Sequence, residues 1–348
     1  PFFLERARAP LRRVRVKRCG SLAGREVRGR SPRPPRPASV VTSVVCPFLP
    51  FARAGFFFLK SNAMPLFHVS RLRGLKHCAW IALAFILARA CMNGLTKKKL
   101  QDYRKKRGLQ TAVDKLQEEI WLVVCGTALS LFSGYLIATS PAFDGCNMFD
   151  TTQCYTSFRS ENVPNEIKGY YLIEVGWYLS LIMKSFFGVG RFDSFVMEFH
   201  HVVTLALIIW SYSTGFTQIV GVVTFFIFNQ SNPLLHLSKL TNYMEWKSTR
   251  AYMFILFAAT FFLSRVVLLP LVVIRSTFFE LPRAVSREDW EGAVVYTWYT
   301  TNACLGALWL LNVYWLKPIL RVIKRNITGM DKGNPTDDTI TREDAKTK

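Results

Sequence analysis

From Lys76 onward, long apolar runs alternate with short polar stretches. The runs far exceed the roughly 10 residues of a transmembrane β-strand and lack strict polar/apolar alternation, so they predict helices. A membrane-crossing helix needs about 20 residues, and the first and fifth runs are marginal by this measure. The pattern predicts an all-α integral membrane protein with about seven transmembrane helices, approximately Cys78–Met92, Ile120–Ser140, Lys168–Phe187, Val196–Phe216, Ile219–Leu237, Ala251–Ile274 and Ala293–Leu316.

Two adjacent histidines, His200 and His201, lie inside the fourth apolar run. Ionisable residues in a membrane-length helix are costly, so each is a candidate for function. Asp193 precedes His200 by seven residues and Thr204 follows it by one turn, so these three residues should share one helical face. His201 points about 100° away from His200. In the third run, Glu174 requires a partner from another helix unless it is neutral.

The fifth run carries a polar stripe, because its polar residues recur at spacings of three and four. Such a stripe must face protein or water, and its members are Asn229, Asn232, His236, Lys239 and Tyr243. Some of these residues can instead have purely structural roles. The two asparagines can simply join helices by hydrogen bonds, Lys239 can reach the membrane surface, and tyrosines such as Tyr243 and Tyr212 are common anchors at the interface.

These residues also carry a resemblance to a known family. Ten residues have a spacing similar to that of the ceramide synthase signature motif, namely His200, His201, Thr204, Ser211, Tyr212, Gly221, Leu235, Lys239, Asn242 and Tyr243. The chain therefore resembles TLC-domain proteins of the longevity-assurance type. The likeness covers roughly residues 119–325 and extends to Tyr170–Glu174 with Tyr178, Arg265 with Pro270, and Trp315. It departs at the family's His-Asp, second Asp and Glu positions, which are here Phe228-Asn229, Asn232 and His236.

The resemblance implies a TLC-domain helical bundle with a lipid cavity in the endoplasmic reticulum membrane. It further implies transfer of a fatty acyl group from acyl-CoA to the amine of a sphingoid base, with acyl-CoA as co-substrate and no other cofactor. A neutral imidazole can take a proton from an amine or attack a thioester. The expected catalytic residues are His200, His201, Asn229, Asn232 and His236, and the expected substrate-binding residues are Asp193, Thr204, Tyr212, Lys239, Tyr243 and Glu174.

Two alternatives belong to other functional classes. One is a non-catalytic TLC-domain protein for lipid sensing, transport or membrane lipid homeostasis, because the acidic positions of the motif are replaced. The other is a metal or haem site made by His200 or His201 with His236. Adjacent helical residues diverge too far to grip one ion together, so no metal is expected. A homodimer is compatible with either class.

Charge is concentrated at the beginning of the chain. Lys and Arg outnumber Asp and Glu by 45 to 23, and residues 1–76 hold 17 of these basic residues against two Glu. A basic arm of this kind can bind nucleic acid. Its Pro/Arg-rich sequence without helical period instead favours a disordered or non-native leader over residues 1–75, with Met64 as a possible initiator and a transit peptide as the second option. No nucleic-acid partner is therefore expected.

Basic loops indicate how the helices are oriented, because such loops remain cytosolic. The strongest comprises Lys97–Lys99 and Arg104–Arg107, and it divides the chain into a first helix with its basic loop (76–118), a TLC domain (119–325) and a cytosolic polar tail (326–348). The histidine pair then lies within about two turns of the cytosolic surface. Cys146 and Cys154 share a lumenal loop, where they form either a disulfide or two free thiols.

Overall fold

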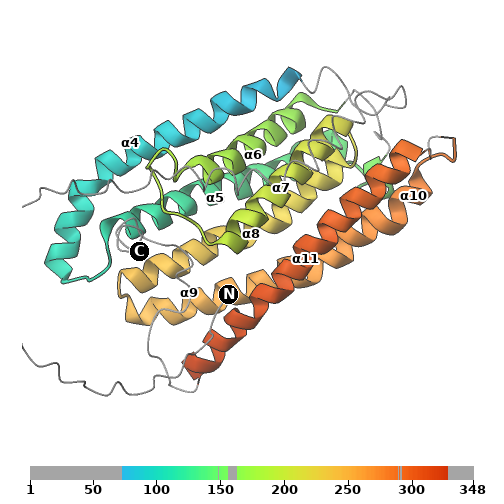
Figure 1. Cartoon of the computed structure of the whole chain (residues 1–348). Helices are drawn as coiled ribbons and strands as arrows, with labels where there is room; N and C mark the ends of the chain where they lie inside the picture. Colours follow the sequence, from blue (N-terminus) through green and yellow to red (C-terminus); the bar gives the residue numbers. More distant parts are fainter. Residues whose placement is uncertain (1–72, 148, 156–162, 289, 291, 328–348) are drawn as a thin grey trace, which may run out of the picture. The chain divides into compact units, whose positions relative to one another are not determined.

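The computed structural model describes residues 73–147, 149–155, 163–288, 290 and 292–327. The predicted leader up to residue 72 and the tail beyond residue 327 lie outside the described residues. The described part of the chain is built from helices and contains no β-strand, which confirms the all-α prediction (Figure 1). Its elements are α4 (Lys76–Arg107), α5 (Val113–Thr139), η2 (Pro141–Phe143), η3 (Thr152–Tyr155), α6 (Asn165–Met183), α7 (Phe195–Thr214), α8 (Gln218–Tyr243), α9 (Lys247–Phe261), η4 (Phe262–Ile274), η5 (Ser276–Glu280), α10 (Leu281–Ala284) and α11 (Gly292–Ile327).

Five helices in the described part of the chain are long and apolar enough to cross a membrane. They are α4, α5, α7, the continuous helix from α9 to α10, and α11. The first run, predicted to be marginal, is therefore among them. The count of seven is not confirmed by length and composition, because α6 contains Glu166, Lys168 and Glu174 and α8 contains the polar stripe. Large apolar side chains such as Leu131 and Leu310 are exposed, as expected of a multi-pass membrane protein.

The basic segment after the first apolar run is helical rather than a loop. Helix α4 continues without a break through Lys97–Lys99 and ends at Arg107. Lys, Arg, Gln and Leu have high helix propensity, so nothing in this stretch stops the helix. Gly108 terminates it with a left-handed backbone (φ 66°). The prediction of a loop here was wrong, because the basic residues form the last turns of α4.

The helices pack into a bundle in which sequence neighbours are often spatial neighbours. Helix α5 lies along α8, α4 lies along α6, and α6 lies beside α7. Helix η4, which is wound as a π-helix, packs against both α8 and α11, and α11 also contacts α7. Helices α6, α7, α8, η4 and α11 therefore surround a common interior. At the contact of α6 with α8, Gly221 is required, because a Cβ there would overlap the Tyr171 hydroxyl.

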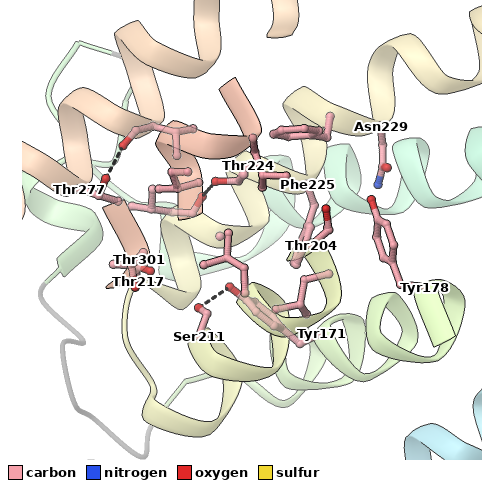
Figure 2. A pocket seen from close by; sticks show the side chains of 18 residues that line it. Tyr171, Tyr178, Thr204, Ser211, Thr217, Thr224, Phe225, Asn229, Thr277 and Thr301 are labelled. Atoms are coloured by element: carbon pink, nitrogen blue, oxygen red, sulfur yellow. Dashed lines mark hydrogen bonds between the residues drawn. The ribbon is translucent and has the colours of Figure 1, made fainter. Parts of the chain in front are cut away.

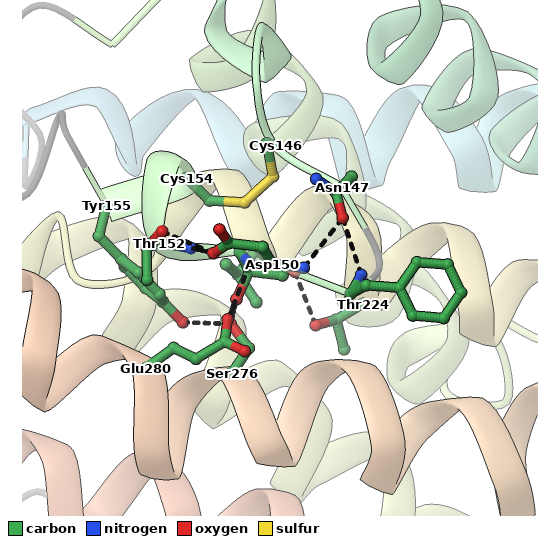
Figure 3. Close-up of a disulfide and its surroundings, with 12 residues drawn as sticks. Cys146, Asn147, Asp150, Thr152, Cys154, Tyr155, Thr224, Ser276 and Glu280 are labelled. Atoms are coloured by element: carbon green, nitrogen blue, oxygen red, sulfur yellow. Dashed lines mark hydrogen bonds between the residues drawn. A yellow bond between two sulfur atoms is a disulfide. The ribbon is translucent and has the colours of Figure 1, made fainter.

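A disulfide between Cys146 and Cys154 closes the loop between α5 and α6 (Figure 3). This decides between the two alternatives that the sequence left open. The closed loop is fastened to the end of η5, where Glu280 accepts a hydrogen bond from the Thr151 amide at 2.8 Å. Arg275 Nη1 lies 2.9 Å from the other carboxylate oxygen of Glu280.

Two ionisable groups in this loop have shifted pKa values. Burial raises the pKa of Tyr155, whose hydroxyl lies 2.6 Å from Ser276 Oγ. The Thr152 hydroxyl and amide donate to the Asp150 carboxylate and lower its pKa. The loop therefore presents an ionised aspartate on its surface, while its tyrosine stays protonated in the contact with η5.

Candidate functional site

The two histidines lie in the first turns of α7, which begins at Phe195 after the capping residue Ser194. Their ring centroids are 5.8 Å apart, but the rings face different neighbours. His200 is 5% exposed and packs edge-on against Trp315 of α11 at 5.2 Å. His201 packs against Tyr178 of α6 at 5.9 Å. Within the described residues neither ring makes a hydrogen bond through Nδ1. His200 is buried and His201 is half-buried.

Asp193 is associated with His201 rather than with His200. Its Oδ2 atom lies 3.8 Å from His201 Nδ1. The predicted shared face of Asp193 and His200 is therefore wrong. Helical spacing does not extend back to Asp193, because this residue lies in the loop before the Ser194 cap.

A group of buried charges adjoins this site and was not predicted. Lys184 Nζ lies 2.9 Å from Asp193 Oδ2 and 2.9 Å from Glu118 Oε1. Arg89 of α4 pairs with the same glutamate. The available sequence signal was the presence of ionisable residues within or beside apolar runs, which marks Arg89 and Glu118 as readily as the histidines.

The partner required by Glu174 is Asn229 on α8, as the prediction of an interhelical partner anticipated. Asn229 Nδ2 donates to Glu174 Oε1 at 2.9 Å. The Tyr170 hydroxyl, one turn earlier on α6, donates to the same oxygen at 2.5 Å. Glu174 has no exposed surface. These contacts give Asn229 a helix-joining role between α6 and α8.

Asn232 and His236 are also occupied by partners other than the histidine pair. Arg265 of η4 donates to Asn232 Oδ1 at 2.5 Å, and to Ser231 Oγ at 2.7 Å. His236 Nδ1 lies 2.7 Å from Glu119 Oε2 on α5. The stripe on α8 therefore faces protein, as expected, but each of its first three members serves a different neighbouring helix.

The remaining predicted residues lie at various depths. Lys239 is half-buried and Tyr243 is buried near the end of α8. Tyr212 packs against Tyr171 with ring centroids 6.1 Å apart, about 18 Å along α7 from His200. The structure does not bring Tyr212 together with the histidine pair. Among the described side chains, no group of three or more His, Cys, Asp or Glu is placed to hold a metal ion.

An elongated apolar cavity of about 50 Å³ lies between α6, α7, α8, η4, η5 and α11 (Figure 2). Tyr178 and Asn229 lie at one end, and Thr217, Thr277 and Thr301 lie at the other. The histidines do not line it directly. Their neighbours do, because Thr204 follows His200 by one turn and Tyr178 packs against His201. The full lining is Tyr171, Tyr178, Thr204, Leu207, Ile208, Ser211, Thr217, Val220, Gly221, Thr224, Phe225, Phe228, Asn229, Val273, Thr277, Thr301, Leu305 and Leu308.

Comparison with known proteins agrees with this architecture. Human ceramide synthase 5 is 27% identical over 221 residues, which are 63% of this chain and 53% of the human protein. Bovine ceramide synthase 4 is 29% identical over 248 residues (68% and 58%), and the tomato Alternaria stem canker resistance protein 1 is 28% identical over 274 residues (76% and 86%). The chain spans about half the length of the animal ceramide synthases that it matches. Residues 115–321, more than half of the chain, match the TLC domain, and the protein therefore belongs to the TLC domain family.

Proposed function

We propose that this protein is a ceramide synthase-like N-acyltransferase, which moves a fatty acyl group from acyl-CoA to the amine of a sphingoid base. The observation that carries the proposal is the position of two adjacent histidines, one buried and one half-buried, beside one end of an elongated apolar cavity. The cavity suits an acyl chain, because burial of each methylene contributes about 0.8 kcal/mol. The similarity to ceramide synthases supports the same assignment.

The reaction requires only groups that this site can supply. The amine nitrogen forms a bond to the thioester carbonyl carbon, the carbon–sulfur bond breaks, and the thiol leaves with the proton that the amine loses. A neutral imidazole can accept that proton as a general base, or can carry the acyl group as a nucleophile before the amine attacks. Because both substrates are held in one membrane site, the bimolecular reaction becomes local.

The position of the pair in α7 suits substrates that arrive from the cytosol. His200 and His201 are the sixth and seventh residues of the helix, about 8–9 Å from its beginning. The basic segments of the sequence predict that this end of α7 lies at the cytosolic surface. A water-borne acyl-CoA would therefore reach the histidines from the cytosol and insert its chain toward Thr217. We propose the endoplasmic reticulum membrane as its location, on the resemblance to ceramide synthases alone.

A second candidate is a lipid-binding protein without catalysis. The observation that favours it is the occupation of the asparagine positions: Asn229 binds Glu174 and Asn232 binds Arg265. Neither amide supplies a negative charge to an imidazolium. In this function the cavity would hold a lipid, and the histidines would contribute packing against Trp315 and Tyr178.

Lipid mass spectrometry of membranes from cells that lack their own ceramide synthesis distinguishes the two functions. The membranes are supplied with a fatty acyl-CoA and a sphingoid base. We expect ceramide from the native chain and a loss of about 100-fold or more for His200→Ala or His201→Ala, at unchanged protein level. His77→Ala is the matched control, because His77 is an exposed histidine in the first turn of α4. Absence of product from the native chain, while human ceramide synthase 5 is active in the same membranes, would refute the proposal.

A further inference from the structure

A continuous line of buried charges connects α4 with His201. At its centre Lys184 is 2% exposed, and its Nζ lies 2.9 Å from both Glu118 Oε1 and Asp193 Oδ2. The line begins with Arg89, which pairs with the second oxygen of Glu118. It ends where Asp193 Oδ2 lies 3.8 Å from His201 Nδ1. The two cations and two carboxylates balance, so the line adds no net charge beside the imidazole.

The loop that carries Asp193 is fixed independently by its backbone. The Val189 carbonyl accepts hydrogen bonds from Arg89 Nε at 3.0 Å and from Asn93 Nδ2 at 2.9 Å. The Arg191 amide donates to Glu118 Oε2 at 3.2 Å. Helices α4 and α5 therefore hold the loop between α6 and α7 in place, and with it the carboxylate that approaches His201.

Stability alone does not account for such an arrangement. Desolvation of buried charges costs as much as their pairing returns, and apolar replacements of similar volume are often neutral or stabilising. What the arrangement does produce is one carboxylate held beside one imidazole. Asn229 and Asn232 are neutral and occupied by Glu174 and Arg265, so they do not perform this task.

We propose that Asp193 and Lys184 are positioning residues for His201. Asp193 accepts the Nδ1–H hydrogen of His201, which leaves the Nε2 lone pair for the proton or acyl group, and Lys184 holds the carboxylate in that place. The partner on one ring nitrogen determines which tautomer the other presents. The gap of 3.8 Å closes when substrate fills the site, as is common for catalytic hydrogen bonds. The proposal rests on the proposed acyl transfer.

The kinetic test is a double-mutant cycle with Asp193→Asn and Lys184→Met. Each single variant should lower kcat by about tenfold or more with little change in KM, because it acts on the base rather than on substrate binding. The double variant should lose no more activity than Asp193→Asn alone, because Lys184 acts through Asp193. Lys184→Arg should retain activity, and Lys98→Met is the control, since Lys98 is an exposed lysine on α4. Thermal unfolding of each variant identifies any that fail to fold.

A labelling test decides the same point without catalysis. Diethyl pyrocarbonate modifies the free nitrogen of neutral imidazole, and mass spectrometry resolves His200 from His201 in the same peptide. At about pH 8, where an ordinary imidazole is neutral, Asp193→Asn should slow modification of His201 at least severalfold relative to His200, and Lys98→Met should not.

Unchanged His201 labelling in Asp193→Asn, or a double variant that multiplies the two single losses, overturns the proposal. If the native chain makes no ceramide while human ceramide synthase 5 does, the proposed function fails, and the labelling rates still decide whether Asp193 positions His201.

Discussion

Replacing Asn229 with aspartate tests the contact between α6 and α8 most directly. In the native chain the amide of Asn229 donates to Glu174 Oε1 at 2.9 Å, and Glu174 has no exposed surface. Asn229→Asp keeps the size of the side chain but replaces the donor with a second carboxylate. Although aspartate is the residue that the ceramide synthase motif has at this position, we expect the change to destabilise this protein.

The magnitude follows from the separation of the two groups. Two carboxylates about 3 Å apart at an effective dielectric constant of about 20 repel by about 5.5 kcal/mol. Uptake of one proton limits the loss, because holding an ordinary glutamic acid protonated at pH 7 costs about 4 kcal/mol. We therefore expect a loss of at most about 4 kcal/mol, or at most roughly 10 °C in Tm for a chain of this size. At about pH 5 protonation costs only about 1 kcal/mol, so the loss should shrink as the pH falls.

Thermal unfolding of the purified protein in detergent, at pH 7 and pH 5, measures the effect. The matched control is Asn232→Asp, which places the same charge beside Arg265 instead of a carboxylate and should be tolerated. The double variant Glu174→Gln with Asn229→Asp should recover the native Tm, because it restores one amide and one carboxylate. A single Asn229→Asp variant as stable as the native protein at pH 7 would refute the reasoning.

Three further predictions concern other parts of the chain. Gly221→Ala should lower the Tm, because the new Cβ overlaps the Tyr171 hydroxyl. Tyr171→Phe in the same chain should recover part of the loss. Equal Tm values for Gly221→Ala and the native chain would contradict this prediction. Cys154→Ser should cost about 2.5 kcal/mol in thermal unfolding and leave a free thiol on the half-buried Cys146 that reacts with maleimide, whereas the native pair should react only after reduction. Asn326 in the sequon Asn-Ile-Thr should carry no glycan, because the basic segments of the sequence predict a cytosolic position for it. A mobility shift on endoglycosidase treatment would contradict this orientation.

The apolar runs alone determined where most helices lie. The fourth run predicted Val196–Phe216, and α7 covers Phe195–Thr214. The second predicted Ile120–Ser140, and α5 ends at Thr139. Hydrophobic periodicity is a local property, and a membrane leaves the backbone few alternatives to the helix. The same logic marked His200, His201 and Glu174 as residues that need partners.

Which partner each residue received was decided only by the tertiary structure. Asp193 lies beside His201 instead of His200. Lys184 pairs with Asp193, and Glu118, far away in the sequence, pairs with Lys184. One residue along a helix rotates a side chain by about 100°, and the relative rotation and height of two helices depend on packing across the whole bundle. The sequence therefore determined that these polar groups had to be satisfied. The packing of α4, α5 and α6 against one another, and of α6 against α7, decided how.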